Sequence, residues 1–355
     1  MSRFICDKLK NLEAYVPGEQ PKDTINIKLN TNESPFPPSK AVIDSINEAS
    51  TLLQLYPDPE CSVLKSKAAK LFGVSPENIF CGNGSDEVLN FAFLAFCDEN
   101  KGMSFPSISY GFYPVFGDLY GIDYKKIPLC DDFSINAADY HGLSTNIVIA
   151  NPNAPTGLCL SAYEVRSILD TNKDNLVIID EAYVDFGAET CIPLIKEYDN
   201  LLVVHTFSKS HSLAGARLGF GIACPEIIED LEKIKYSTNP YNINRSTMAA
   251  GIAAIDDNDY YMNNCKTVIK AREYTTAELR KLGFCVIESK ANFVFARHQT
   301  ISGEEIYTML RQNGILVRHF SSEIIKDFNR ISIGSPDQME VLINTLKKLL
   351  LNQGG

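Results

Sequence analysis

The sequence predicts an α/β fold, because two patterns agree along residues 60–223. Apolar, β-rich runs alternate there with helix-like segments, which is typical of βαβ units and of a mainly parallel sheet covered by helices. Polar motifs follow the carboxyl ends of the runs, where open α/β sheets bind their ligands. The candidate strands are short and almost continuously apolar, as buried strands are, and span 78–81, 102–105, 146–150, 176–180, 201–206 and 218–223.

The pattern changes on both sides of this region. Residues 1–40 are rich in proline and show little periodicity, so we expect an extended arm there rather than a core element. After residue 224 a long helical segment, 260–282, precedes shorter strand-like and helix-like runs at 284–287, 292–296, 303–312, 315–318, 330–333 and 337–350. We therefore predict an arm and part of a small domain at 1–52, a large ligand-binding domain at 53–258, and a small C-terminal α/β domain at 259–355.

Composition narrows the function classes. The chain has 355 residues, 45% of them hydrophobic and 22% charged, which is ordinary globular usage. A net charge of −11 opposes binding to nucleic acid or to an anionic membrane. The ten cysteines form no CxxC pair and the five histidines no HExxH motif, so we expect no metal site. With no apolar leader or spanning segment in the sequence, we expect a cytoplasmic protein.

The segment 205–217, HTFSKSHSLAGAR, follows an apolar run and combines groups that bind anions with a reactive amine. The hydroxyls of Thr206 and Ser208 and the guanidinium of Arg217 can hold a phosphate, while Lys209 can form an imine with an aldehyde. Pyridoxal phosphate carries both groups. A lone lysine is more often a solvated surface residue, so the rest of the chain must decide.

Two further motifs follow strand ends. The turn GNGSDE, residues 82–87, opens an apolar helix at 88–97, and such a helix N-terminus binds phosphate. A dinucleotide fingerprint would require glycine where Glu87 stands, which disfavours NAD. Asp180 ends the apolar run 176–180, and a carboxylate there needs a cationic partner such as a pyridinium nitrogen. An ordinary glycine turn and a capping aspartate are the structural alternatives.

The remaining candidates are weaker when each is taken singly. The loop 151–157, NPNAPTG, has two X-Pro bonds that can fix an unusual backbone path. Tyr110 can stack on a flat ring, and Tyr183 can reach a ring hydroxyl. Arg318 and Arg330 each adjoin an apolar strand, where burial of an arginine makes sense if an anion is bound. A rigid loop and surface arginines remain the alternatives.

Taken together, the order GNGSDE, NPNAPTG, DEAY, FSKSHSLAGAR and NRISIG resembles the fold-type-I pyridoxal-phosphate aminotransferases over almost the whole chain. Within that superfamily, four shorter stretches are similar to the histidinol-phosphate aminotransferase subgroup. They are YVPG at 15–18, LNTNESP at 29–35, YPDP at 56–59 and ILVRHF at 315–320. The resemblance implies a seven-stranded type of sheet in the large domain and pyridoxal 5'-phosphate as the cofactor.

The resemblance also implies a role for each matching residue. Lys209 would hold the cofactor and, once displaced by substrate, would move a proton between the substrate carbon and the cofactor. Tyr110 would stack on the ring, Asp180 would pair with the pyridinium nitrogen, and Tyr183 would bond the ring hydroxyl. The phosphate would be held by Ser85 and Asp86 (both through backbone amides), Thr206, Ser208 and Arg217.

A homodimer with shared active sites is a further implication. Tyr56 matches a tyrosine that reaches the cofactor phosphate of the neighbouring subunit. The arm around Tyr15 would cover the partner's substrate site.

The substrates implied are L-histidinol phosphate and 2-oxoglutarate, converted to imidazole-acetol phosphate and L-glutamate in histidine biosynthesis. Arg318 and Arg330 would grip the substrate phosphate, and Arg330 would take the carboxylate of glutamate in the other half-reaction. Tyr15 and Asn32 complete the expected substrate-binding set. An aromatic or other amino-acid aminotransferase and a threonine-phosphate decarboxylase remain alternatives on the same fold. A noncatalytic cofactor-binding regulator is disfavoured by the acidity of the chain.

The chain departs from the pattern at one position. Most relatives read NPNNPTG where residues 151–157 read NPNAPTG, and the asparagine that bonds the ring hydroxyl is replaced by Ala154. A methyl group donates no hydrogen bond. Compensation by Tyr183 alone, by a water or by a shifted Asn153 is open, so Asn153 is kept as a candidate cofactor contact.

Overall fold

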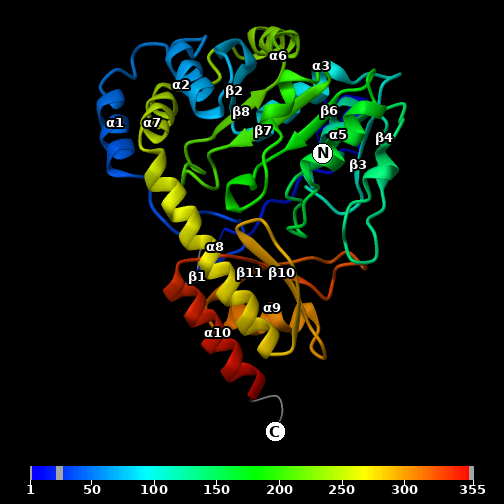
Figure 1. Ribbon diagram of the computed structural model, residues 1–355, viewed down its shortest axis with the longest axis vertical. Helices are drawn as coiled ribbons and strands as arrows, with labels where there is room; N and C mark the ends of the chain where they lie inside the picture. The colour runs from blue at the N-terminus through cyan, green and yellow to red at the C-terminus, as the bar shows by residue number, and fades with distance from the viewer. Residues whose placement is uncertain (1, 21–26, 352–355) are drawn as a thin grey trace.

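The computed structural model describes residues 2–20 and 27–351 and contains two sheets, one above the other in Figure 1. The upper, seven-stranded sheet comprises β2 (Ile79–Asn83), β3 (Met103–Pro106), β4 (Tyr124–Ile127), β5 (Asn146–Ala150), β6 (Val177–Asp180), β7 (Leu201–Thr206) and β8 (Leu218–Ile222). Their order is β2-β8-β7-β6-β5-β3-β4, and β8 runs in the direction opposite to the other six strands. The predicted α/β class with a mainly parallel sheet is confirmed.

Helices cover both faces of this sheet. They are α1 (Lys40–Ser50), α2 (Ser62–Phe72), α3 (Ser85–Phe96), α4 (Phe112–Tyr120), α5 (Ala162–Thr171), α6 (Pro225–Thr238) and α7 (Arg245–Asp256). Side chains of β5 alternate between the faces: Ile147 and Ile149 pack in the core with α1, α2, α5 and α7, whereas Val148 and Ala150 pack with α3, α4 and α6.

The lower, five-stranded sheet has the order β1-β11-β12-β10-β9. Its strands are β1 (Ile27–Leu29), β9 (Phe284–Ile287), β10 (Phe293–His298), β11 (Ile315–His319) and β12 (Asn329–Ser332). The helices α8 (Asn258–Lys281), α9 (Gly303–Gln312) and α10 (Pro336–Leu351) accompany it, and α8 runs from the upper part to the lower one in Figure 1. Short 3-10 turns lie at Asp7–Leu9, Pro76–Asn78, Ala137–Tyr140, Val184–Phe186 and Ile192–Lys196.

The arm predicted for the first 40 residues is wrong for one segment. Residues 27–29 form β1, which pairs in parallel with β11 and buries Ile27 and Leu29 in the core of the small sheet. Three residues are too few for a periodic signal, and the partner strand lies far along the chain. The boundaries proposed at residues 52 and 258 stay predictions, since α8 packs its Tyr261 in one core and its Val268 in the other.

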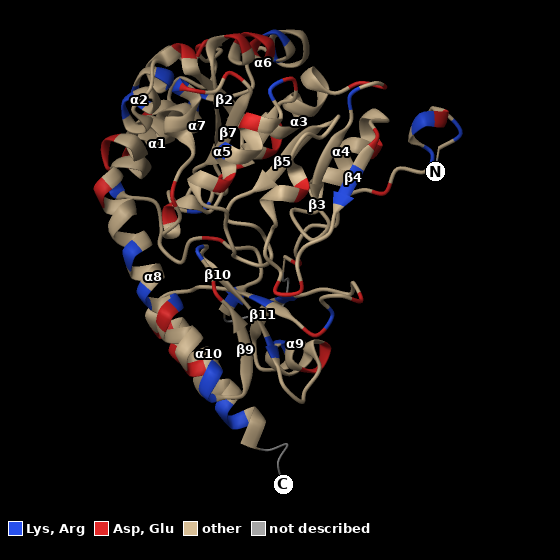
Figure 2. Ribbon diagram, turned by 45° about the vertical axis from the view of Figure 1, so that its right-hand side comes forward, with Lys and Arg blue, Asp and Glu red and all other residues tan. Residues whose placement is uncertain are grey.

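Charge is distributed unevenly over the elements. Figure 2 shows acidic and basic residues on helices such as α6, α8 and α10, while most of the large sheet carries none. Blue segments also lie beside β10 and β11, between the two sheets. The carboxyl ends of β5, β6 and β7 and the basic residues of the small sheet therefore border the same region.

Candidate active site

Two adjoining cavities lie between the sheets. The outer one has a volume of about 460 Å³ and the inner one about 90 Å³. They share four lining residues, namely Tyr110, Ala154, Tyr183 and Lys209, so Lys209 stands where the two meet. The inner cavity is also lined by the predicted cofactor contacts Ser85, Asp86, Asp180, Thr206, Ser208 and Arg217.

Part of the inner cavity is suited to bind an anion. The helix α3 begins at Ser85, so free backbone N–H groups and the positive end of the helix dipole meet there. Gly84 has a φ of +77°, and a Cβ on it would lie 2.4 Å from Nη2 of Arg217. Glycine is therefore required both by the backbone conformation and by the close approach of the guanidinium.

Two hydroxyl groups, those of Thr206 and Ser208, also line the inner cavity. The Ser208 N–H donates to Oγ1 of Thr206 over 3.1 Å, and that hydroxyl lies 2.9 Å from Oγ of Ser208. Arg217 has a left-handed backbone, with a φ of 59°, and its Nη2 lies 2.9 Å from the Asp86 carboxylate. This carboxylate also accepts a 2.7 Å hydrogen bond from the Tyr110 hydroxyl. Sequence reasoning expected only the backbone of Asp86 to act here, and the structure shows that its side chain orients two neighbours.

Asp180 ends β6, lines the inner cavity and is buried. Its carboxylate accepts hydrogen bonds from the Tyr113 hydroxyl at 2.9 Å and from the Ala182 N–H at 3.2 Å. Burial raises the pKa of Asp180 to about 6, and the two hydrogen bonds oppose that rise. A buried carboxylate with this environment is suited to hold a cationic ring nitrogen.

Tyr113 was missed by sequence reasoning. It follows Tyr110 by three residues, across the turn that leads into α4, where the Tyr113 N–H donates to the Tyr110 carbonyl over 3.3 Å. The two rings meet edge to face, with centroids 5.6 Å apart. That spacing within the aromatic stretch 110–113 was the signal available in the sequence.

Lys209 is placed to act as a nucleophile. Its amine donates to the Thr31 carbonyl over 3.1 Å and lies 6.0 Å from the centre of the Tyr183 ring. Burial, and after it the positive charge of Arg330, lowers the pKa of Lys209 to about 8. A substantial share of the amine is therefore neutral near physiological pH, as reaction with an aldehyde requires.

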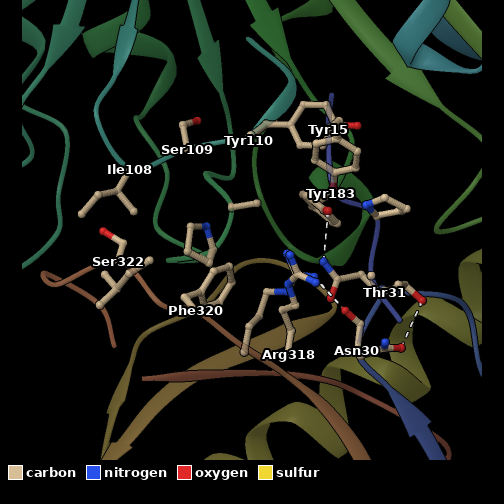
Figure 3. A pocket seen from close by; sticks show the side chains of 18 of the residues that line it. Tyr15, Asn30, Thr31, Ile108, Ser109, Tyr110, Tyr183, Arg318, Phe320 and Ser322 are labelled. Carbon is tan, nitrogen blue, oxygen red and sulfur yellow. Dashed lines mark hydrogen bonds between the residues drawn. The ribbon is translucent and has the colours of Figure 1, made fainter. Parts of the chain in front are cut away.

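The outer cavity carries the predicted substrate arginines. Arg318 on β11 and Arg330 on β12 stand directly opposite each other in antiparallel register. Nη2 of Arg330 donates to the Asn30 carbonyl over 2.9 Å, and burial lowers the pKa of Arg330. Figure 3 shows Arg318 and Phe320 across the cavity from the tyrosines Tyr15, Tyr110 and Tyr183.

The arm segment around Tyr15 lies against its own chain. The Tyr15 ring packs on Phe112, with centroids 4.7 Å apart, and lies 6.2 Å from Tyr110. Aromatic contacts within one chain therefore hold this ring beside Tyr110, and the expectation that the arm covers the partner's site stays a prediction. Burial raises the pKa of Tyr15.

Asn32 lies in the outer cavity and reaches Tyr183. Its Nδ2 donates to the Tyr183 hydroxyl over 3.1 Å, a contact drawn as the dashed line at Tyr183 in Figure 3. Asn32 is 1% exposed and has a φ of 56°. Burial raises the pKa of Tyr183, so its hydroxyl keeps its hydrogen.

The structure does not bring two predicted residues into these cavities. Tyr56 is 78% exposed and stacks on Tyr241, with ring centroids 4.5 Å apart. Asn153 is buried, but its amide donates to the Ile108 carbonyl over 2.9 Å and accepts from Oγ of Ser109 over 2.7 Å. Both X-Pro bonds of the loop 151–157 are cis. The role of Asn153 as a cofactor contact stays a prediction, since its amide is already used within the loop.

Two kinds of feature are absent from residues 2–20 and 27–351. Within these ranges, no cluster of three or more His, Cys, Asp or Glu side chains is arranged to hold a metal ion. Over the same part of the chain, no helix combines the length and the apolarity that crossing a membrane would require.

Comparison with known proteins gives a consistent result. Residues 24–346 match the family described as aminotransferase class I and II. The histidinol-phosphate aminotransferase of Brachyspira hyodysenteriae is 49% identical over 354 residues, which cover 99% of this chain and 100% of that protein. The corresponding enzyme of Clostridium botulinum is 48% identical over 351 residues and 99% of both chains.

Solved structures share the fold. Histidinol-phosphate aminotransferase from Sinorhizobium meliloti, in complex with pyridoxal-5'-phosphate, superposes with a TM-score of 0.86 at 24% identity, covering 93% of this chain and 92% of that one. The enzyme of Clostridium acetobutylicum gives a TM-score of 0.84 at 25% identity, over 92% of this chain and 99% of that one.

Proposed function

This chain belongs to the class I and II aminotransferases, and we propose that it transfers the amino group of L-histidinol phosphate to 2-oxoglutarate. The products are imidazole-acetol phosphate and L-glutamate. Full-length relatives at 49% and 48% identity that are named for this reaction support the proposal.

The observation that carries the substrate choice is the pairing of Arg318 with Arg330. Like charges directly opposite each other on antiparallel strands repel and are destabilising. Both residues line the outer cavity beside Lys209. A doubly charged phosphate offsets the repulsion of two guanidinium groups better than a single carboxylate does, and arginine binds either anion in a bidentate manner. A phosphorylated amine is therefore the substrate that this pair fits best.

The residues that line the inner cavity suit the chemical groups of pyridoxal 5'-phosphate. The N-terminus of α3, the hydroxyls of Thr206 and Ser208, and Arg217 suit its phosphate. The buried Asp180, which lines the same cavity, suits its ring nitrogen. When bound, this cofactor takes up the amino group at its aldehyde carbon and draws electron density from the substrate carbon into its ring.

Three residues of this chain have separate roles in the reaction. Asp180 keeps a proton at the ring nitrogen, since a buried carboxylate favours a cationic partner. Tyr110 covers a face of the ring and helps to exclude water. The neutral amine of Lys209 would accept a proton from the substrate carbon and would then donate a proton as the conjugate acid, so that one group would serve as general base and general acid.

The proposal includes a homodimer in the cytoplasm. A tyrosine as exposed as Tyr56, on a surface with Leu53 and Leu55 also exposed, suits contact with a second copy whose cofactor phosphate it reaches. The ten cysteines are free thiols, which suits a reducing compartment.

A panel of half-reactions tests the proposal. The purified enzyme loaded with pyridoxal phosphate is mixed separately with L-histidinol phosphate, L-phenylalanine and L-threonine phosphate, and products are identified by mass spectrometry. We expect histidinol phosphate to react with the highest kcat/KM and to give imidazole-acetol phosphate. Preference for phenylalanine, or release of carbon dioxide from threonine phosphate, would overturn the assignment in favour of another activity on this fold.

A further inference from the structure

We propose that Asn32 is a positioning residue that directs the hydroxyl hydrogen of Tyr183 into the inner cavity, toward the ring hydroxyl oxygen of the bound cofactor. The inference rests on the proposed function, because it takes pyridoxal phosphate as the occupant of that cavity. Asn32 acts on the cofactor by orienting Tyr183.

The hydrogen bonds around Asn32 fix which way its amide points. The Asn32 backbone N–H donates to Oγ of Ser332 over 2.8 Å, so the Ser332 hydroxyl hydrogen is free to donate in turn. It does so to Oδ1 of Asn32 over 2.9 Å. With Ser332 as the donor, the amide oxygen faces Ser332 and the NH₂ group faces Tyr183.

This polarity determines what Tyr183 can do. A phenol oxygen accepts hydrogen bonds and carries one hydrogen to donate. Because Asn32 supplies the donor in their 3.1 Å contact, the Tyr183 hydrogen is not used there. Tyr183 lines both cavities, whereas Asn32 lines the outer one, so the free hydrogen is left for a group in the inner cavity.

The neighbouring Ala154 makes this hydrogen more important. Ala154 also borders both cavities, and its methyl group offers no hydrogen bond to a ring oxygen. A residue that holds the Tyr183 hydroxyl in one orientation lowers the cost of ordering it when the cofactor binds.

Asn32 is also tied to the substrate arginines. Ser332 and Arg330 are two residues apart on β12, so their side chains lie on the same face of the strand. The Asn32 carbonyl accepts a further 2.9 Å hydrogen bond from Nδ2 of Asn292, next to β10. The small sheet thus sets the position of Asn32 with the same strand that carries Arg330.

The test uses the holoenzyme without any amino donor and follows the pH midpoint of its visible absorption band. The variants are Asn32→Gly, Asn32→Asp, Tyr183→Phe and the double variant Asn32→Gly/Tyr183→Phe. Glycine and aspartate both tolerate the φ of 56°, so the deletion does not strain the backbone. Melting temperatures of the apoenzymes report whether each variant folds.

An O–H donor at the ring oxygen stabilises its negative charge, so losing that donor raises the pH at which the bound cofactor releases its proton. We expect Tyr183→Phe to raise the midpoint by about half a unit to one unit, the size of one net hydrogen bond. Asn32→Gly should raise it by less, and the double variant should match Tyr183→Phe. Asn32→Asp should raise it most, because the carboxylate draws the Tyr183 hydrogen to itself.

Asn30→Asp is the matched control, because it places a carboxylate in the same cavity on a residue that lines it beside Asn32. An equal shift for Asn30→Asp and Asn32→Asp, or additive shifts in the double variant, would overturn the inference. A wild-type chain that gains no visible band with pyridoxal phosphate would instead contradict the proposed function, so the two failures are distinguishable.

Discussion

The hydroxyl of Tyr113 donates a 2.9 Å hydrogen bond to the carboxylate of Asp180, and both side chains are buried. Burial favours the neutral acid, and the hydrogen bond favours the carboxylate. A carboxylate is needed to pair with a pyridinium nitrogen. Tyr113 therefore helps to keep Asp180 charged at a position where the surroundings would otherwise protonate it.

We expect Tyr113→Phe to weaken pyridoxal phosphate binding and to shift the acid side of the pH profile upward. A hydrogen bond to a charged group contributes about 1.5–3 kcal/mol, which corresponds to roughly tenfold or more in affinity. Asp180 has a raised pKa of about 6, so activity falls as pH drops through that range, and losing a donor moves the fall to higher pH. Cofactor titration and kcat/KM against pH measure both effects. Tyr163→Phe, at an 81% exposed tyrosine, is the control and should leave both unchanged.

Removing Arg318 should separate the two half-reactions. Arg318→Ala takes away one of the two guanidinium groups proposed to hold the phosphate, while Arg330 remains for the carboxylate of glutamate. A hydrogen bond to a charged group contributes about 1.5–3 kcal/mol, so we expect kcat/KM for histidinol phosphate to fall at least tenfold more than that for glutamate. Arg297→Ala removes an exposed arginine of the same sheet and should change neither value. Equal losses for both substrates contradict the role of Arg318.

The depressed pKa of Lys209 predicts how the apoenzyme captures its cofactor. Only the neutral amine reacts with an aldehyde, and the neutral fraction rises as pH increases through about 8. Stopped-flow measurement of pyridoxal phosphate uptake should show a rate that climbs up to about pH 8 and then levels off. Arg330→Ala removes a positive charge that lowers this pKa, so its midpoint should move to higher pH. A midpoint near the ordinary lysine value of 10.5 in the wild-type chain would contradict the prediction.

Local sequence patterns predicted the interior of the large sheet well. The runs 146–150 and 201–206 coincide with β5 and β7, because buried parallel strands are continuous apolar segments with polar ends. The edge strand β4, Tyr124–Ile127, was not predicted. It contains Lys125 and Lys126, both exposed, and an edge strand that carries charge lacks the apolar pattern of its neighbours.

The predicted site followed from topology more than from any single motif. Motifs after β6 and β7 had to meet, since parallel strands share one carboxyl edge. The contacts that orient the side chains of the site could not be predicted from the sequence, because they join residues that are distant in the chain. Tyr113 and Asp180 are 67 residues apart, and Asn32 and Tyr183 are 151 apart. No local periodicity encodes such pairs. Likewise, the proposed role of the exposed Tyr56 requires a second copy of the chain.

Mixed dimers test whether Tyr56 serves the partner's site. Lys209→Ala and Tyr56→Ala chains, carrying different affinity tags, are co-expressed and the mixed species is isolated. We expect the Lys209→Ala homodimer to be inactive and the Tyr56→Ala homodimer to bind the cofactor about tenfold more weakly, through loss of a hydrogen bond to phosphate. The mixed dimer should regain activity at low pyridoxal phosphate, because one of its sites combines an intact Lys209 with an intact Tyr56 from the other chain.

The matched control for mixed dimers places both changes in one chain. A Lys209→Ala/Tyr56→Ala double variant paired with the wild-type chain leaves the only intact Lys209 facing a partner without Tyr56, so that dimer should show the weak cofactor binding of Tyr56→Ala. If instead this control binds cofactor as tightly as the wild type while the first mixture does not recover, Tyr56 acts within its own chain. In that case the exposed ring of Tyr56, stacked on Tyr241, would belong to the surface of one subunit. The proposal that the subunits share their active sites would then be wrong.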